Sequence, residues 1–469
     1  MVFSSVTFLF FFLPLVLALY FLTPGIRLKN ALLLIVSWVF YAWGEGELVI
    51  LMILSSAFNY FIGLWIHKAK TSSIPLFVGV LGNLLTLIYF KYVGLLVGSI
   101  DTILGTEWNN GIDIHLPIGI SFFTFQSISY LVDLKRGEAK VQKNPFDLML
   151  YISLFPQLIA GPIVRYVQIE RELKFREHTL LNFVEGAKRF SIGLAKKVLI
   201  ANVVGEISDE IFQMPSSEMY FALSWFAISA YALQIYFDFS GYSDMAIGLG
   251  KMFGFKFPEN FNYPYVSSSI QEFWRRWHIT LSTWFRDYLY IPLGGNRKGT
   301  QRLYFNLVVV FFITGMWHGG TWNFVLWGLL HGAYLIIERI GFGKVLSKSR
   351  LLGHVYTMLA VLMAWVLFRI PDLNQALDFY RTMFLLTAET EGLVLMDLLD
   401  REYVVMFVVA VILCMPVREV LLRVREKVSH KILRVTLDYA SMLFHLVLLI
   451  LSSMSIASST YNPFIYFRF

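Results

Sequence analysis

Long apolar stretches recur along almost the whole chain and are separated by short polar loops. Many of these stretches reach about 18 residues, which is long enough for a helix to cross a lipid bilayer. A helix satisfies its own backbone hydrogen bonds in lipid, whereas an irregular segment does not. The pattern therefore predicts an all-α polytopic membrane protein with about 11 transmembrane helices. The first is expected within Met1–Leu22, because neither a basic n-region nor a small-residue cleavage site marks a signal peptide.

Two segments do not fit a simple up-and-down order of spans. Residues 147–163 lie between two basic stretches and contain Phe155-Pro156-Gln157 and Gly161-Pro162, so a re-entrant segment is expected there. Residues 303–337 also have basic flanks and must enter the membrane and return within 35 positions. Two helices of about 15 residues rise only about 22 Å each. Their turn, at residues 317–320, is therefore expected inside the bilayer. One or two re-entrant elements are thus predicted besides the spans.

Composition supports the same fold class. Hydrophobic residues make up 57% of the 469 positions and charged residues only 15%, with a mean hydropathy of +0.63. Soluble domains are about one-quarter charged, so a soluble core is excluded and a single membrane domain over residues 1–469 is predicted. The lipid bilayer is its expected surrounding, and no nucleic acid partner is expected. Cys414 is the only cysteine, which excludes disulfides and thiolate metal sites within the chain. The histidines outside the central third lack metal-ligand spacing, so no metal is expected. The sequence has no P-loop, Rossmann fingerprint or glycine-rich serine elbow, so no bound cofactor is expected.

The distribution of charge predicts the orientation, because basic loops tend to stay in the cytoplasm. Arg27 and Lys29 follow the first apolar stretch, which places the N-terminus outside. The next loops alternate in sign, and the basic stretch 418–434 leaves the tail 458–469 outside as well. The chain is therefore expected in the cell (inner or plasma) membrane with both termini extracytoplasmic.

Candidate chemistry gathers in the central third. The stretch Gln271–Gly295 interleaves Arg275, Arg276 and Arg286 with aromatic residues, and charges at membrane depth usually face an interior cavity. His318 stands in the glycine-rich sequence Met316–Gly320. An imidazole in a protected cavity is the natural general base for a hydroxyl or thiol near neutral pH.

At these residues the chain resembles the membrane-bound O-acyltransferase family, and within it the branch that acetylates alginate, peptidoglycan or cellulose. The resemblance rests on several motifs that run in order along the chain: Leu116–Gln126, Phe155–Pro162, Phe237–Asp244, Phe273–Gly295, Met316–Gly319 and the tail Phe464–Phe469.

The resemblance implies a funnel across the membrane in which cytosolic acetyl-CoA donates an acetyl group for O-acetylation of an extracytoplasmic polysaccharide. His318 would be the catalytic histidine and His278 the second polar residue of the site. As a hypothesis, His318 takes the proton of the acceptor hydroxyl, while His278 orients the acyl group or stabilises the developing oxyanion. The resemblance also implies an extracytoplasmic SGNH-hydrolase-like acetyltransferase as partner, since this chain contains no such domain.

Six residues are candidates for contact with the acyl donor: Arg275, Arg276, Arg286, Trp317, Arg297 and Lys298. Arginine suits bidentate contact with phosphate. For Arg297 and Lys298 the alternative is that they are basic only because they face the cytoplasm.

The tail carries a further candidate. Phe464-x-Tyr466-x-x-Phe469 resembles the C-terminal motif of a small partner protein in D-alanyl-teichoic-acid transfer, whose tyrosine is thought to accept the acyl group. Tyr466 would then be a covalent acyl relay. The alternative is an aromatic anchor at the membrane interface.

Three other polar residues are interpreted as structural. On a continuous helix, the 13 positions between His318 and His331 would turn His331 away from His318, so His331 is expected to be a helix-packing or cavity-lining residue and not a second catalytic base. Asp238 and Asp244 are expected to bind helix ends or the arginines of Phe273–Gly295, because an intramembrane acid usually has a partner.

Two alternative functions remain at this stage. One is transfer of D-alanine or another acyl group by the same family, and the other is a multi-pass transporter or flippase. No inverted repeat is apparent and the polar residues cluster in one third of the chain, which favours the acyltransferase.

Overall fold

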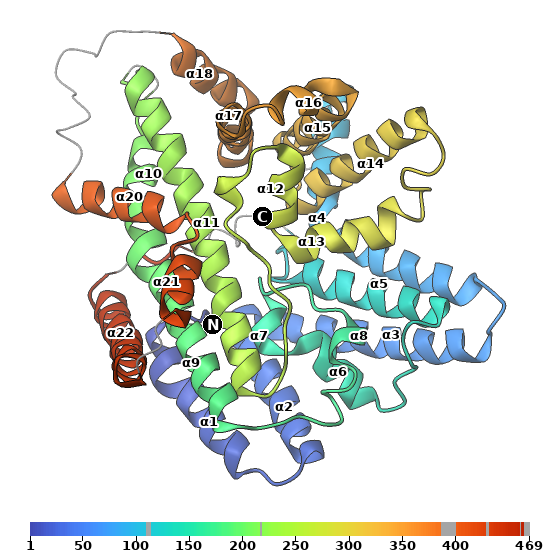
Figure 1. Ribbon diagram of the computed structural model, residues 1–469. Helices are drawn as coiled ribbons and strands as arrows, with labels where there is room; N and C mark the ends of the chain where they lie inside the picture. Colours follow the sequence, from blue (N-terminus) through green and yellow to red (C-terminus); the bar gives the residue numbers. More distant parts are fainter. Residues whose placement is uncertain (109–113, 216–217, 386–399, 428–430, 460, 464–469) are drawn as a thin grey trace. The chain divides into compact units, whose positions relative to one another are not determined.

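A computed structural model describes residues 1–108, 114–215, 218–385, 400–427, 431–459 and 461–463. The described residues form helices and turns without any strand, as the apolar pattern predicts (Figure 1). They fall into two compact units, residues 1–190 with 245–259, and residues 191–244 with 260–469. The predicted single membrane domain over 1–469 stays a prediction.

The first unit contains the N-terminal helices, of which α9 continues into the second unit. Its elements are η1 (Phe8–Phe12), α1 (Leu13–Leu22), α2 (Ile26–Glu45), η2 (Gly46–Leu48), α3 (Val49–Lys68), α4 (Ile74–Leu104), α5 (Ile120–Arg136), α6 (Pro145–Ser153), α7 (Phe155–Leu158), α8 (Tyr166–Ile169) and α9 (Leu180–Ala195).

The second unit contains the remaining elements, together with most of α11. They are η3 (Lys196–Ala201), α10 (Asn202–Phe212), α11 (Phe221–Met252), η4 (Pro264–Val266), α12 (Ile270–Arg276), α13 (Ile279–Phe285), η5 (Arg286–Tyr290), α14 (Thr300–His318), α15 (Trp322–Ile337), η6 (Glu338–Phe342), α16 (Gly343–Leu346), α17 (Arg350–Arg369), α18 (Leu373–Phe384), α20 (Arg401–Leu413), α21 (Val417–Glu426) and α22 (Lys431–Ser458).

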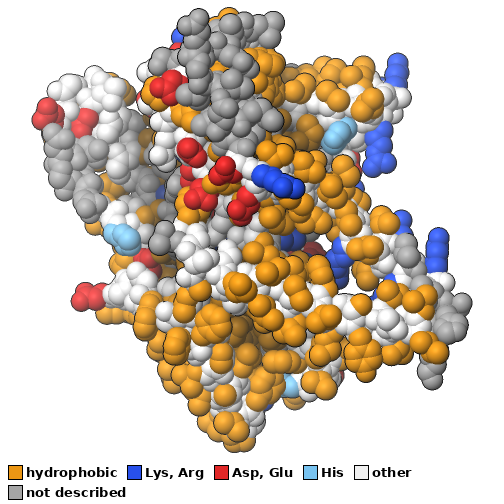
Figure 2. Space-filling view, turned by 90° about the vertical axis from the view of Figure 1, so that its left-hand side faces the viewer, with side chains coloured by type: hydrophobic (Ala, Val, Ile, Leu, Met, Phe, Trp, Pro, Cys, Tyr) orange, Lys and Arg blue, Asp and Glu red, His pale blue; other side chains and the backbone are white. Residues whose placement is uncertain are grey.

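Several of these helices are long and apolar enough to cross a membrane. Within the described residues there are five such runs, at 26–68, 74–104, 322–346, 350–369 and 432–458, or six if the bent pair α20 and α21 counts as one. Their outer surfaces are apolar, as Ile103 on α4 and Phe61 on α3 show with 80% and 66% exposure. In Figure 2, hydrophobic side chains cover broad areas of the surface, and charged ones form small groups. The chain is thus a multi-pass membrane protein. The count of about 11 spans and the funnel stay predictions.

Polar side chains also join helices inside the first unit. Asn59 on α3 and Asn83 on α4 exchange two hydrogen bonds, of 3.1 and 2.8 Å, and both side chains are buried. Such amide pairs hold transmembrane helices together, because lipid offers no competing partner.

The predicted re-entrant segment at 147–163 is a broken helix. α6 ends at Ser153 and α7 begins at Phe155, and the backbone between them leaves the helical region. The segment from Leu150 to Val164 is buried, with Gln157 donating to the carbonyl of Tyr151 at 2.6 Å. Irregular backbone at this position is therefore enclosed by protein, as the sequence predicts, whereas its depth in a membrane stays a prediction.

Candidate active site

His278 lies at the bend between two short helices, α12 and α13. Its backbone is left-handed (φ 42°, ψ 55°), a conformation that is uncommon for residues other than glycine. The side chain is completely buried, and its ring lies 4.7 Å from that of Phe239 and 5.8 Å from that of Trp317. Burial lowers the pKa of His278 to about 3, so the imidazole is neutral at physiological pH.

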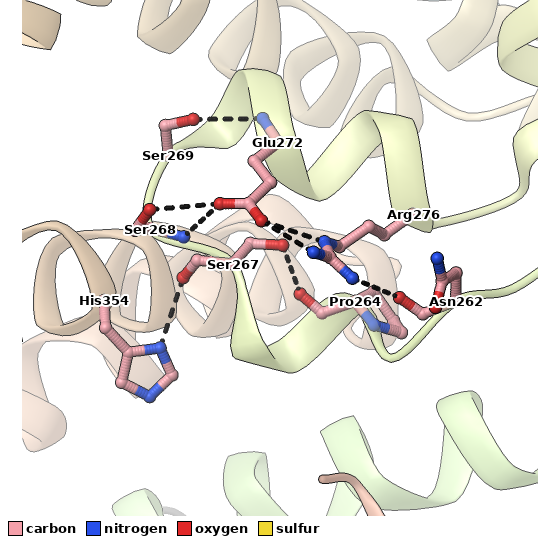
Figure 3. A network of polar contacts seen from close by, with 8 residues as sticks. All are labelled: Asn262, Pro264, Ser267, Ser268, Ser269, Glu272, Arg276 and His354. Carbon is pink, nitrogen blue, oxygen red and sulfur yellow. Dashed lines mark hydrogen bonds and ion pairs between the residues drawn. The ribbon is translucent and has the colours of Figure 1, made fainter. Parts of the chain in front are cut away.

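A polar network fixes the start of α12 (Figure 3). The hydroxyl of Ser269 caps the helix by accepting from the backbone N–H of Glu272 at 3.0 Å. The carboxylate of Glu272 accepts from the N–H and hydroxyl of Ser268, both at 3.0 Å, and pairs with Arg276 at 2.9 Å. Arg276 in turn donates to the carbonyl of Asn262 at 3.1 Å. The loop that precedes α12 is thereby tied to the helix that leads to His278.

The network also determines the charge of Glu272. Partial burial alone would raise the pKa of this carboxyl group, but the hydrogen bonds from Ser268 and Arg276, with the positive charge of Arg276, bring it below its usual value. Glu272 is therefore ionised at neutral pH and acts as an acceptor only.

His318 is the last residue of α14 and is only 5% exposed. The ring centroids of Trp327 and Phe368 lie 4.8 and 5.1 Å from that of His318, and the ring of Trp317 lies at 4.8 Å. The ring of Trp317 thus contacts the rings of both histidines. The structure brings His278, Trp317 and His318 into one buried cluster within the second unit.

Glycines allow the close pairing of α14 and α15 that holds His318 in place. A methyl group at Gly315 would lie 2.3 Å from the carbonyl oxygen of Phe324, and one at Gly328 would lie 2.2 Å from that of Phe311. Only a residue without a side chain permits this approach. The sequence prediction of a helix pair with a turn at 317–320 is confirmed in its topology, with the turn at Gly319–Thr321.

His331 on α15 packs among aromatic residues, one of which, Trp327, also contacts His318. The indole N–H of Trp274 donates to its Nδ1 at 3.3 Å, and its ring is parallel to that of Phe273. The rotation expected from a continuous helix does not apply, because the chain turns between α14 and α15. His331 and His318 both contact the ring of Trp327, at 4.9 and 4.8 Å. The packing role predicted for His331 agrees with this position.

The two aspartates of α11 each form an ion pair with a lysine. Asp238 pairs with Lys197 at 2.9 Å, and each side chain is 3% exposed. Asp244 pairs with Lys196 at 2.7 Å. Both intramembrane acids therefore have a charged partner, and these partners are neighbouring lysines of η3.

The basic candidates for donor contact do not share one environment. Arg276 pairs with Glu272, and Arg286 pairs with its neighbour Asp287 at 2.6 Å. The other three, Arg275 on α12 and Arg297 and Lys298 before α14, are exposed.

The tail returns to the second unit at its last described residues. The hydroxyl of Tyr461 donates to Asp209 at 2.8 Å, and Asn202 donates to the Tyr461 carbonyl at 3.2 Å. The ammonium group of Lys197 donates to the carbonyl of Pro463. Tyr466, the predicted relay, lies outside the described residues.

Some residues of the cluster have no signal in the sequence. Asn260, Trp327 and Phe368 come from three separate elements and surround the histidines only through the tertiary fold. A lone asparagine and single aromatic residues in apolar helices are too common to single out.

Known proteins resemble this chain over most of its length. The model of the family described as "MBOAT, membrane-bound O-acyltransferase family" matches residues 35–375. A protein named probable alginate O-acetylase, from Azotobacter vinelandii, is 47% identical over 392 residues, which cover 82% of this chain and 78% of that protein. A peptidoglycan O-acetyltransferase from Helicobacter pylori is 37% identical over 423 residues, covering 82% and 80%. A teichoic acid D-alanyltransferase from Bacillus subtilis is 30% identical over 231 residues, covering 46% and 58%.

Proposed function

This chain belongs to the membrane-bound O-acyltransferase family, and from that premise we propose that it transfers an acetyl group from cytosolic acetyl-CoA for O-acetylation of an extracytoplasmic polysaccharide. The observation that carries the proposal is the buried cluster of His278, Trp317 and His318. The polysaccharide is of the alginate or peptidoglycan kind, by analogy with the names of the two relatives that this chain matches over 82% of its length.

The proposed chemistry assigns the base to His318. The imidazole takes the proton of the acceptor hydroxyl, and the oxygen bonds to the carbonyl carbon of the thioester. The carbon–sulfur bond then breaks, and the proton on His318 passes to the departing thiolate. His278 is the second polar group at the reacting atoms. The burial of both rings suits this step, because electrostatic interactions are stronger where water is excluded.

Donor contact is assigned to the exposed basic side chains Arg275, Arg297 and Lys298, which are available for the phosphates of the donor. Arg276 and Arg286 already bind carboxylates, so they serve mainly to hold the backbone. We assign Trp317 to the wall of the site, because its ring contacts the rings of both histidines.

The remaining steps concern the far side of the membrane. The transmembrane spans enclose a funnel, and both termini are extracytoplasmic. Tyr466 serves as the acyl relay. An extracytoplasmic SGNH-hydrolase-like partner then completes the transfer to the polymer. The anchoring of Tyr461 and Pro463 to η3 and α10 supports a fixed position for the tail that leads to Tyr466.

Membership of an enzyme family removes the transporter or flippase alternative. Transfer of D-alanine stays a second candidate because a D-alanyltransferase is 30% identical over 46% of this chain. Acetyl transfer is favoured, since the O-acetylating relatives match far more of it.

The test is thiol release from acetyl-CoA by the purified protein in nanodiscs, with a polysaccharide acceptor and the extracytoplasmic partner supplied. We expect release by the wild type, loss of about 100-fold or more in His318→Ala, and unchanged release in His67→Ala, which removes an exposed histidine at the end of α3. The same assay with a D-alanyl thioester, run in parallel, shows which of the two acyl donors the protein uses. Failure to turn over any acyl thioester, with the partner supplied, would contradict the proposal.

The relay has a separate readout. Mass spectrometry of the C-terminal peptide is expected to show an acetyl adduct on Tyr466 in the wild type and none in Tyr466→Phe. Thiol release that persists at the wild-type rate in Tyr466→Phe, without an adduct in the wild type, would make the tail an anchor.

A further inference from the structure

Asn260 is a completely buried residue in the loop between α11 and α12. Its side-chain oxygen faces three groups: the backbone N–H of Thr280 at 3.3 Å, the hydroxyl of Thr280 at 2.8 Å and Nδ1 of His278 at 3.1 Å. Its amide nitrogen donates to the hydroxyl of Ser243 at 3.1 Å. The side chain of Asn260 therefore links α11 to both sides of the bend that carries His278.

The Thr280 backbone determines which way this amide faces. A backbone N–H can only donate, so the atom of Asn260 beside it must be the carbonyl oxygen. The opposite orientation would put two donors against each other. An oxygen at this position accepts only, and Nδ1 of His278 must then carry a hydrogen. A neutral imidazole has one N–H, which leaves Nε2 of His278 as a bare acceptor.

No group among the described residues donates to that acceptor. Nε2 of His278 is buried and has no hydrogen-bond partner among the described residues. Leaving a buried polar group unsatisfied costs about 1–3 kcal/mol, and such a group in a native protein calls for an explanation, of which a catalytic role is one.

The backbone conformation of His278 also supports a functional role for this residue. The residue is held at positive φ by a hydrogen bond from the N–H of Ile279 to the carbonyl of Asn260, at 2.9 Å. Strained residues persist where the surroundings over-determine them, often at active sites. Asn260 thus restrains both the backbone next to His278 and the rotation of its ring.

We infer that Asn260 is the positioning residue of His278 and fixes it as the Nδ1–H tautomer, so that Nε2 accepts a hydrogen bond from the bound acceptor molecule, at a donor other than the hydroxyl that His318 deprotonates. The identity of the acceptor molecule rests on the proposed function, whereas the tautomer does not. A bare Nε2 has no hydrogen to give to an oxyanion. His278 therefore orients the acceptor molecule, and stabilisation of the oxyanion falls to other donors.

The tautomer is tested by solid-state ¹⁵N NMR on the full chain in lipid, with histidine ring nitrogens labelled. The difference between wild type and His278→Gln identifies the two signals of His278. We expect a protonated Nδ1 and an unprotonated Nε2, and in Asn260→Leu a shift to the other tautomer or to a mixture. A wild-type Nε2 that carries the hydrogen would overturn the inference.

Kinetics test the positioning role. Asn260→Leu, which keeps the volume but not the acceptor, is expected to lower kcat for thiol release about 10- to 100-fold, as loss of a partner that orients a functional histidine does in other sites. KM for acetyl-CoA should change by less than about twofold. Asn260→Asp restores an acceptor and should recover much of the loss. Ser243→Ala, the matched control, removes only the partner of the amide nitrogen and should stay near wild type.

The outcomes separate the two proposals. A folded Asn260→Leu protein with wild-type kcat would end the positioning role even if acetyl transfer is correct. Absence of turnover in the wild type together with the expected tautomer would end the proposed function and leave the inference standing.

Discussion

His278 combines an unusual backbone with a buried ring, and the backbone alone leads to a prediction. Left-handed conformations cost an ordinary residue about 1–2 kcal/mol, asparagine much less, and they are least tolerated by β-branched residues. We expect His278→Val to unfold at a clearly lower temperature than His278→Asn, with thermal unfolding in detergent as the measurement. Equal unfolding temperatures would show that φ at this position relaxes freely.

The sequence was informative about residues whose neighbours along the chain form a motif. His318 within Met316–Gly319 and His278 within Phe273–Gly295 were predicted in this way, and the structure places them beside one another through Trp317. Asn260 was not predicted, because its role depends on Thr280 and His278, 18 to 20 positions away and across a bend. No local pattern records such a hydrogen bond.

At the level of elements, the loop before α12 depends on one charged carboxylate. Glu272 has a lowered pKa in the folded protein, so its ionised form stabilises the fold at all pH values above about 4.5, its ordinary pKa. This stabilisation is lost as the pH falls from there through the lower, folded pKa. We expect the unfolding temperature of the wild type to fall more steeply below pH 4.5 than that of Glu272→Gln.

The comparison needs a pH series of thermal unfolding for the two proteins in the same detergent. At neutral pH the variant should be the less stable of the two, since the amide cannot pair with Arg276 as a carboxylate does. Parallel curves over the whole series would mean that Glu272 does not hold the loop.

The ion pair between η3 and α11 gives a second prediction at this level. Lys197→Met would leave the carboxylate of Asp238 buried without its cation, at a cost of about 3–5 kcal/mol. The double variant Lys197→Met with Asp238→Leu should recover much of that loss. Denaturant unfolding measures both, and a single variant as stable as the wild type would show that water reaches Asp238.

The helices and the breaks within them were more predictable from the sequence than the ion pairs that join one helix to another. The two-helix turn within 303–337 and the broken segment 147–163 followed from apolar length, proline and glycine. The pairing of Asp238 with Lys197 did not follow, since several basic residues were equally plausible and only the packing of η3 on α11 selects one.

For the whole molecule, the solitary cysteine makes the predicted orientation easy to measure. In a Cys414→Ser background, Thr71→Cys lies in an exposed basic loop after α3 and Ala457→Cys near the end of α22. We expect an impermeant maleimide to label Thr71→Cys only from the cytoplasmic face and Ala457→Cys only from the opposite face. Labelling of both from one face would contradict the predicted topology.

Membrane residence was predictable at this scale because apolar length alone decides it. The number of spans was not, since several apolar helices are short, bent or partly buried by protein, as the 59° bend between α20 and α21 illustrates. Hydropathy reflects the free energy of placing a side chain in lipid. A helix that is covered by neighbouring helices can carry polar side chains without contact with lipid.

The aromatic rings around His318 also affect the hydrolysis of the acyl donor when no acceptor is bound. A thioester bound next to a solvent-exposed imidazole would be hydrolysed by water. The acyl donor would then be consumed without any transfer to an acceptor. Trp317, Trp327 and Phe368 leave His318 only 5% exposed, so water has little access to the site. We therefore expect idle hydrolysis to be slow, which under the proposed function would couple consumption of the donor to the arrival of an acceptor.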